Sequence, residues 1–171
     1  DQSPLRVFGP PPTASLTRKL FDAPDGAFVC DWSARVGHPG SQRVFANRGG
    51  KLLRTAPKVD AVDIDATFVL DEGGLVLRAA PTVHVQPHME SLAYRVDSDH
   101  GSIVFTGDTE PVESVIELAR GADMMLCMCW DTDAAMKANG EYGGMTGTTS
   151  AGLLAAQAGI RTLVLTHINA H

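Results

Sequence analysis

Three polar side chains stand within or directly behind short apolar stretches that are expected to form strands. Residues 82–85 alternate and carry His84, and the apolar run 102–106 stops at a Gly-Asp-Thr sequence that contains Asp108. Near the end of the chain, the run Arg-Thr-Leu-Val-Leu-Thr leads straight into His167. Imidazole and carboxylate groups at the ends of neighbouring strands suit a divalent metal, because rigid elements hold ligands within a fraction of an ångström. The pattern therefore predicts a metal site, only part of which lies in this chain.

Each of these side chains also has a plainer explanation. Asp108 could cap a helix that begins at Pro111, and a lone histidine at a strand end is more often structural or merely exposed. His88 lies four residues after His84, but Pro87 between them rules out the helical geometry that would place both on one metal.

The polar, glycine-rich stretch 131–147 is a candidate active-site loop. Tyr142 and Thr146 lie in it and could contact a substrate. A simpler explanation for threonine in this part of the chain is capping of the following helix by Thr148.

Composition narrows the classes of protein to which the chain can belong. Its 171 residues, 44% hydrophobic and 20% charged, are typical of one globular domain, and no apolar run approaches the roughly 18–20 residues of a membrane span. The net charge of −6 provides no basic footprint, so nucleic acid is disfavoured as a partner. Three cysteines do not suggest a disulfide scaffold and favour the cytoplasm. Cys127 and Cys129 share one face of a strand and could bind metal, but within an apolar run buried, inert thiols are favoured.

Hydrophobic periodicity predicts the elements that would position these residues. Strands are expected at 5–8, 59–70, 75–80, 91–97, 102–106, 123–130 and 161–166. Helices are expected at 111–120 and 148–158, and a further helix, capped by Thr13 or Ser15, is expected to run to about Phe21. Residues 27–55 have a weak pattern with many glycines, which predicts loop or a few short strands. Hairpins in the first half and alternating strands and helices in the second half fit mixed sheets with helices outside them.

Taken in order, these segments resemble the metallo-β-lactamase superfamily, and specifically its ribonuclease Z-like and phosphodiesterase-like hydrolase branch. The matching segments are the histidine-bearing stretch before SLAYRVD, then SIVFTGDT, ELARGADMML and AGLLAAQAGIRTLVLTH, which lie within residues 75–167. LRVFGPPPT also resembles the strand and turn that follow the family's first metal motif. The resemblance implies an α+β fold, an αββα sandwich of mixed β-sheets with outer helices.

The resemblance also implies roles for individual residues. His84, or its reserve His88, would bind one zinc ion, Asp108 would bridge two zinc ions, and His167 would bind the second. A hydroxide held between the two ions would attack an ester, lactone, phosphodiester or related bond of a small-molecule substrate. Asp108 would take part in catalysis by orienting that hydroxide.

Two departures from the family's pattern bear on the substrate. Cys127-Met128 stand where many relatives have His-Glu, and Gly144-Met145 precede Thr146 where ribonuclease Z-like members carry a histidine. That histidine assists phosphodiester cleavage in those relatives, so its replacement predicts that true tRNA processing is not the activity. No RNA-binding arm is evident either, which adds to the charge argument against nucleic acid.

The family's first metal motif, His-x-His-x-Asp-His, is nowhere in the sequence. We therefore expect residues 1–171 to form a single domain of this type that is incomplete at the N-terminus and at the C-terminus, and this piece alone to be inactive. Two alternatives stay open: a mononuclear iron redox member of the same fold, and a non-catalytic, metal-free binding domain. A homodimer is allowed, and no association with a membrane is expected.

Overall fold

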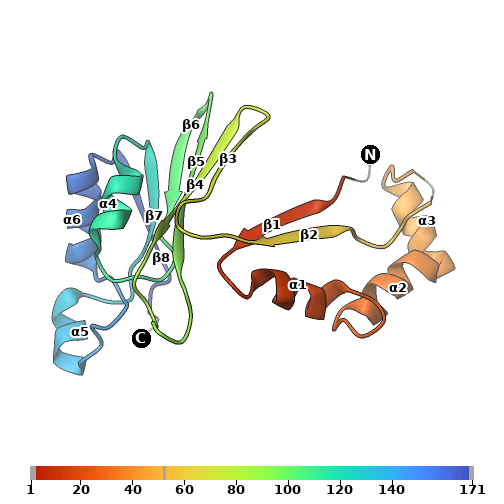
Figure 1. Ribbon diagram of the computed structural model, residues 1–171, viewed down its shortest axis with the longest axis horizontal. Coiled ribbons are helices and arrows are strands. Elements are labelled where there is room, and N and C mark those ends of the chain that lie inside the picture. The colour runs from red at the N-terminus through yellow and green to blue at the C-terminus, as the bar shows by residue number, and fades with distance from the viewer. Residues whose placement is uncertain (1–2, 52, 170–171) are drawn as a thin grey trace. The chain divides into compact units, whose positions relative to one another are not determined.

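A computed structural model describes residues 3–51 and 53–169 of the chain (Figure 1). The chain divides into two compact units, residues 1–63 and residues 64–171, and each is described by itself. In the described part, no helix combines the length and the apolar character needed to cross a membrane.

The first unit is a two-stranded parallel sheet with three short helices. Its elements in order are β1 (Leu5–Gly9), α1 (Thr13–Phe21), α2 (Val29–Gly37), α3 (Pro39–Asn47) and β2 (Val59–Asp63). The hydroxyl of Thr13 donates to the carbonyl oxygen of Pro10 at 2.6 Å and starts α1. Asp63, at the end of β2, accepts from the backbone N–H of Ala14 at 2.8 Å, which ties that helix start to the sheet.

The second unit is built on a six-stranded sheet in the order β3-β4-β5-β6-β7-β8. Its strands are β3 (Val69–Glu72), β4 (Leu75–Pro81), β5 (Leu92–Ser98), β6 (Gly101–Phe105), β7 (Met124–Met128) and β8 (Thr162–Thr166). Neighbours from β3 to β6 are antiparallel, whereas β6, β7 and β8 are parallel. The carboxyl ends of these three parallel strands therefore meet at one edge of the sheet, the edge to which Asp108 and His167 belong.

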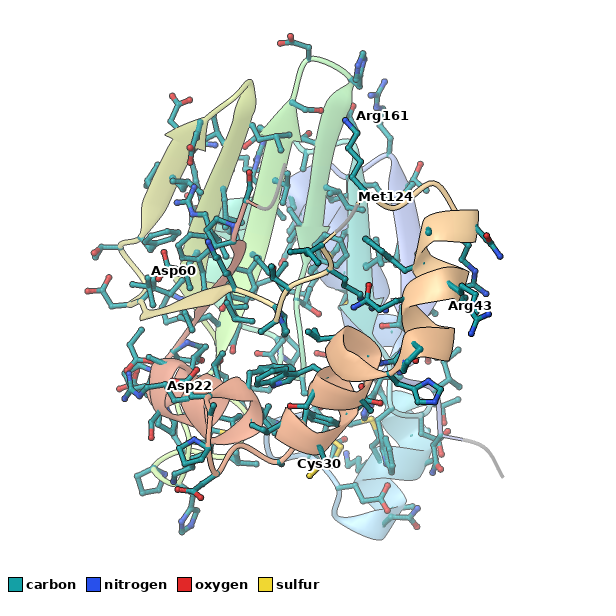
Figure 2. All side chains as sticks on the ribbon, turned by 90° about the vertical axis from the view of Figure 1, so that its right-hand side faces the viewer. Asp22, Cys30, Arg43, Asp60, Met124 and Arg161 are labelled. Carbon is teal, nitrogen blue, oxygen red and sulfur yellow. The ribbon has the colours of Figure 1, made fainter. Side chains whose placement is uncertain are left out.

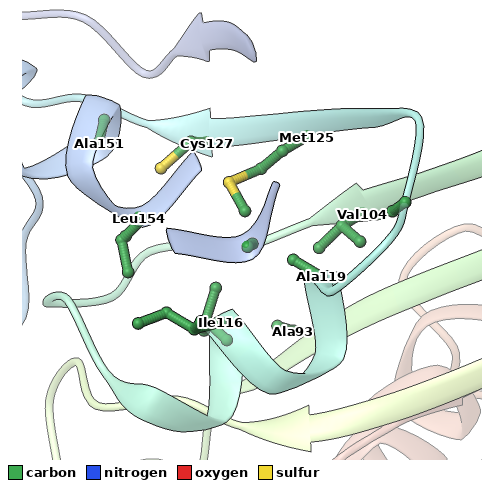
Figure 3. Packing of buried hydrophobic residues seen from close by; sticks show 11 residues of the cluster. Ala93, Val104, Ile116, Ala119, Met125, Cys127, Ala151 and Leu154 are labelled. Carbon is green, nitrogen blue, oxygen red and sulfur yellow. The ribbon is translucent and has the colours of Figure 1, made fainter. Parts of the chain in front are cut away.

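Two helices of this unit cover one face of the sheet, as Figure 1 shows. They are α4 (Glu113–Ala119) and α6 (Thr148–Ala158), and the shorter α5 (Asp133–Asn139) precedes α6. The buried core lies between them and the sheet (Figure 3). Val104 of β6 and Met125 of β7 are fully buried there against Val115 of α4 and Ala151 of α6. This packing holds the strand ends rigidly, since each fully buried aliphatic side chain stabilises the fold by about 1.5–3 kcal/mol.

Several local predictions are wrong, each for a physical reason. Residues 27–55 contain two helices, α2 and α3, separated by His38, and here Pro39 opens a helix at its first position instead of breaking one. The predicted strand 59–70 is two strands that belong to different units. The stretch 82–85 is not a strand, because β4 ends at Pro81. Within the candidate loop 131–147, Thr132 caps α5 by accepting from the N–H of Ala135.

Candidate metal centre

His84, Asp108 and His167 come together although they lie far apart along the chain. The Nε2 atom of His84 is 3.9 Å from Oδ2 of Asp108, and the Nε2 atom of His167 is 3.6 Å from the same oxygen. The side chains are 22%, 36% and 48% exposed for His84, Asp108 and His167, so solvent and small ligands can reach them. Two imidazoles thus face one carboxylate oxygen from two different elements.

The segment that carries His84 is tied to the residues that follow Asp108. The N–H of Val83 donates to the hydroxyl of Thr109 at 3.2 Å, and the N–H of Glu110 donates back to the carbonyl of Val83 at 2.9 Å. These two hydrogen bonds join the segments around Val83 and Thr109 side by side, although neither segment forms a strand here. They explain why His84, next to Val83, lies close to Asp108, next to Thr109.

A third segment sets the orientation of the His84 ring. Nδ1 of His84 lies 2.8 Å from the carbonyl oxygen of Gly144. A carbonyl oxygen only accepts hydrogen bonds, so Nδ1 must carry the hydrogen. In the neutral ring, Nε2 then has a free lone pair, and this is the atom that faces Asp108. A histidine held through its other nitrogen by a backbone carbonyl is the usual arrangement of a metal ligand.

Asp108 owes its position to the turn that follows β6. Gly107 has a φ of 61°, a conformation that glycine adopts without strain. The fully buried Thr106 before it accepts from the N–H of Met128 at 3.2 Å, which joins the turn to β7. Helix α4 begins after Val112 without any side-chain cap. The alternative in which Asp108 caps this helix is therefore wrong.

His167 has a strained backbone directly after β8. Its φ is 55°, and it is the only non-glycine residue with a positive φ in the described part of the chain. Such a conformation is uncommon outside glycine and clusters at functional sites. The ring of Trp130 lies beside it, with centroids 5.7 Å apart and an angle of 37° between the rings. The N–H of Asn169 donates to the carbonyl of Trp130 at 2.8 Å, which holds the chain after the turn.

The chemistry of these atoms fits a divalent cation. Nitrogen and carboxylate oxygen are the donor atoms that zinc takes from histidine and aspartate, and here Nε2 of His84 and Nε2 of His167 lie within 3.9 Å of the same Oδ2 of Asp108. Zinc lies about 2.0–2.2 Å from nitrogen and oxygen ligands, so two ligands of one ion are at most about 4.3 Å apart. Both measured separations fall below that limit and above the length of a direct hydrogen bond. The fit is limited to these two pairs of atoms, because among residues 3–51 and 53–169 no group of three or more His, Cys, Asp or Glu side chains is arranged to hold a metal ion.

The remaining predicted site residues occupy other places. His88 is exposed, and no hydrogen bond, ion pair or ring contact joins its side chain to Asp108 in the described residues. Tyr142 is 49% exposed and lines a hollow of about 310 Å³ together with Glu110. Thr146 is fully buried, and its hydroxyl donates to the carbonyl of Thr109 at 2.6 Å, so it supports the turn after Asp108.

The structure also tests two further predictions, the capping of α6 by Thr148 and the burial of Cys127 and Cys129. Thr148 does not cap α6, because the cap position is Gly147 and no side chain there accepts a hydrogen bond. The carboxylate of Asp133 caps the start of α6 instead, because it accepts a hydrogen bond from the N–H of Thr149 at 2.6 Å. Cys127 and Cys129 are buried, as predicted, and burial raises the pKa of Cys127 to about 11.

Sequence reasoning missed the residues that position the histidines. Gly144 is buried with a φ of 75°, and a Cβ at this position would overlap the carbonyl group of His84. Glu110 accepts from the N–H of Gly144 at 3.4 Å, and Trp130 donates from its ring nitrogen to Glu141 at 3.1 Å. The Gly-Gly pair at 143–144 was the only local signal for such a close approach, because glycine marks places where two backbones meet.

Curated relatives match almost the whole chain. Ribonuclease Z from Mycobacterium tuberculosis (strain ATCC 25618 / H37Rv) is 30% identical over 98% of this chain and 57% of its own length. Ribonuclease Z from Mycobacterium marinum is 32% identical over 98% of this chain and 56% of its own length. The chain thus spans little more than half the length of these relatives.

Solved structures share the fold. The short form of human tRNase Z superposes with a TM-score of 0.62 at 18% identity, over 99% of this chain and 62% of that protein. The metallo-beta-lactamase fold protein YhfI from Bacillus subtilis has a TM-score of 0.57 at 21% identity, over 78% and 51%. Zn²⁺-bound PqqB from Methylobacterium extorquens has a TM-score of 0.53 at 14% identity, over 99% and 56%. These likenesses confirm the predicted α+β fold of metallo-β-lactamase type.

The prediction that disfavours nucleic acid as a partner is wrong. It is overturned by the relatives just described, which carry the name ribonuclease Z. The physical error was to use the net charge of −6 as if it were spread evenly. Nucleic-acid affinity depends on the local placement of cations, not on the total charge.

The family itself is shown by the sequence match. Residues 29–168 match the model of the beta-lactamase superfamily domain, a range that includes His84, Asp108 and His167. At the level of the family, these matches confirm the predicted enzyme class, a metal-dependent hydrolase. The chain belongs to the beta-lactamase superfamily and, within it, to the ribonuclease Z-like proteins.

Proposed function

We propose that the protein is a zinc-dependent phosphodiesterase that cleaves RNA. The observation that carries this proposal is the convergence of the His84 and His167 Nε2 atoms on one oxygen of Asp108. The names of the curated relatives support RNA as the substrate, and the zinc-bound structural neighbour supports the choice of metal.

Each residue would have a separate task at the bound metal. His84 would bind through Nε2, with its ring held in one tautomer by Gly144. His167 would also bind through Nε2, and Asp108 would supply a carboxylate oxygen, since both Nε2 atoms lie within 3.9 Å of its Oδ2. Bound zinc supplies a Lewis acid and lowers the pKa of the water that it holds towards about 7, which provides a nucleophile at neutral pH. Asp108, partly exposed, would accept a hydrogen bond from that water and orient it towards the phosphorus atom.

Two zinc ions need more ligands than these three side chains provide, because zinc takes about four ligands each. The proposal therefore includes further ligands beyond His84, Asp108 and His167. It also treats both compact units as parts of one domain, since the family match at 29–168 extends across both. The three cysteines are free thiols, as is usual in a reducing compartment, and on this ground we place the protein in the cytoplasm.

The proposal is tested by measuring metal content and hydrolysis of bis(p-nitrophenyl) phosphate by the complete protein. His84→Ala, Asp108→Ala and His167→Ala should each lower kcat/KM by about a hundredfold or more and reduce bound zinc. His88→Ala and His100→Ala remove exposed histidines and serve as matched controls that keep full activity. Equal losses in His88→Ala and His84→Ala would contradict the assignment of the ligands, and iron instead of zinc would favour the redox alternative.

A further inference from the structure

Charge is divided unevenly between the two units. Residues 1–63 contain nine Lys and Arg against six Asp, a net charge of +3, whereas residues 64–171 contain five Lys and Arg against fourteen Asp and Glu, a net charge of −9. The cations of the first unit are concentrated further. Residues 32–59 hold six Lys and Arg and not one Asp or Glu.

Three of these six cations line a hollow on the helices α2 and α3. A hollow of about 480 Å³ is lined by Arg35, His38, Arg48 and Arg54, with Phe45 among them. The guanidinium carbon of Arg54 lies over the ring of Phe45, 5.2 Å from its centre. No residue of either helix is fully buried, so this side of the unit is open to a large ligand.

A second hollow, lined mainly by aromatic and apolar side chains, adjoins the first. It measures about 380 Å³, and Arg35 and Arg54 belong to both hollows. Phe21 and Phe28 stack within it at 5.6 Å between ring centres, and Phe28 is 48% exposed. An exposed aromatic face beside a cationic hollow can receive a base and its phosphate together.

Most of these positive charges are not neutralised within the unit. Asp31 pairs with Arg35 through two hydrogen bonds of 2.7 and 3.2 Å. In residues 3–51 and 53–169, the side chains of Arg43, Arg48 and Lys51 form no ion pair or hydrogen bond, and all three are exposed. Figure 2 shows Arg43 projecting away from α3. Like charges within one small unit repel one another, and an anionic ligand would relieve this repulsion.

We propose that the surface of α2, α3 and the following residues to Lys58 binds single-stranded RNA. The cations would hold successive phosphates, and Phe28 would stack on an unpaired base. Duplex RNA keeps its bases paired and stacked, so it cannot use the aromatic hollow. This inference rests on the proposed function, because it assigns the surface through which the RNA substrate is held.

The test measures binding of a fluorescein-labelled single-stranded RNA of twelve nucleotides by anisotropy at several salt concentrations. The complete protein carries Asp108→Ala throughout, so that bound RNA is not cleaved. In the patch variant, Arg43, Arg48 and Lys51 are each changed to Gln. In the matched control, Arg18, Lys19 and Lys137 are changed to Gln, which removes the same charge from exposed positions elsewhere.

The patch variant should bind the RNA at least tenfold more weakly than the parent, and the slope of log K against log salt should fall by about two. The control variant should lose less than threefold, and Phe28→Leu should lose roughly fivefold at unchanged slope. Equal losses in the patch and control variants, no binding by the parent, or equal affinity for a duplex of the same length would overturn the proposal.

Hydrolysis of bis(p-nitrophenyl) phosphate separates this inference from the proposed function. With Asp108 restored, the patch variant should keep the kcat and KM of the unchanged protein for this small substrate, because it has no further phosphates to bind. Failure of the protein to hydrolyse it would count against the phosphodiesterase and leave the binding result standing. If the patch variant lost this activity as well as RNA binding, the three cations would not serve RNA binding alone, and the proposal would be overturned.

Discussion

Nδ1 of His84 lies 2.8 Å from the carbonyl oxygen of Gly144, a residue sixty positions further along the chain. This single hydrogen bond decides which ring nitrogen carries the hydrogen and which is free to bind a metal. It depends on a backbone-to-backbone approach that leaves no room for a side chain at position 144. Gly144 therefore belongs to the candidate centre, because its carbonyl oxygen orients the ring of His84.

Gly144→Ala should weaken metal binding by about 10–100-fold and destabilise the protein by about 1–3 kcal/mol. The added Cβ would overlap the His84 carbonyl, and a φ of 75° strains any residue other than glycine. Zinc titration and thermal unfolding measure the two effects. Gly143→Ala is the matched control, because a Cβ there meets nothing within 4 Å. Unchanged zinc affinity in Gly144→Ala would show that the His84 ring is held by other contacts.

Trp130 should report on the state of His167 by fluorescence. Its ring centre is 5.7 Å from that of His167, so metal binding at the histidine changes the surroundings of the indole. The protein has two tryptophans, and Trp32→Phe leaves Trp130 as the single emitter. We expect zinc to change the emission of this variant. The same titration after adding His167→Ala should be flat, and an identical response there would place the metal elsewhere.

Asp133 should stabilise the protein in a pH-dependent manner. Partial burial by itself raises the pKa of this carboxyl, but hydrogen bonds from Ser150 and from the N–H groups of Thr149 and Ser150 outweigh it and lower the pKa below 3.8. A lowered pKa in the folded state means that the stabilisation is complete above the unfolded pKa of about 3.9 and is lost as the pH falls through the folded value.

Asp133→Asn should therefore cost about 1 kcal/mol at pH 7, where the charged side chain faces the start of α6. The difference from the unchanged protein should shrink as the pH falls below 4. Urea unfolding at a series of pH values measures it, and Asp99→Asn, in an exposed turn, is the control. A difference that stays constant down to pH 3 would mean that the charge of Asp133 is not what matters.

Thiol labelling should distinguish the three cysteines. Cys30 is exposed on α2 (Figure 2), whereas Cys127 and Cys129 are buried and burial raises the pKa of both. With a pKa of about 11, Cys127 has only about 0.1% thiolate at pH 8. An excess of a disulfide reagent should titrate one thiol in the native protein and three in denaturant. Cys30→Ser should remove the rapid reaction, and any remaining fast thiol would indicate an opening of the core.

Local pattern was enough to predict most of the second unit. The apolar runs that end before Asp108 and His167 are strands, and α6 has the predicted bounds 148–158. A hydrophobic run and the glycine that ends it lie within a few neighbouring residues, so these elements can be predicted without knowledge of distant contacts. In the first unit, by contrast, α2 and α3 are short, and no residue in either is fully buried. Both helices are only nine residues long, and the glycines and Pro39 in and around them concealed them.

The amino-acid sequence determined which side chains can act as ligands and that Asp108 and His167 follow strands, because ligand chemistry and hydrophobic period are local properties. Only the tertiary structure decided that His84 and His167 face the same oxygen of Asp108 and that Gly144 selects the tautomer of His84. The reason is physical: these relations depend on hydrogen bonds and strand pairing between segments dozens of residues apart. Their geometry follows from the packing of the whole sheet, which no short stretch of sequence contains.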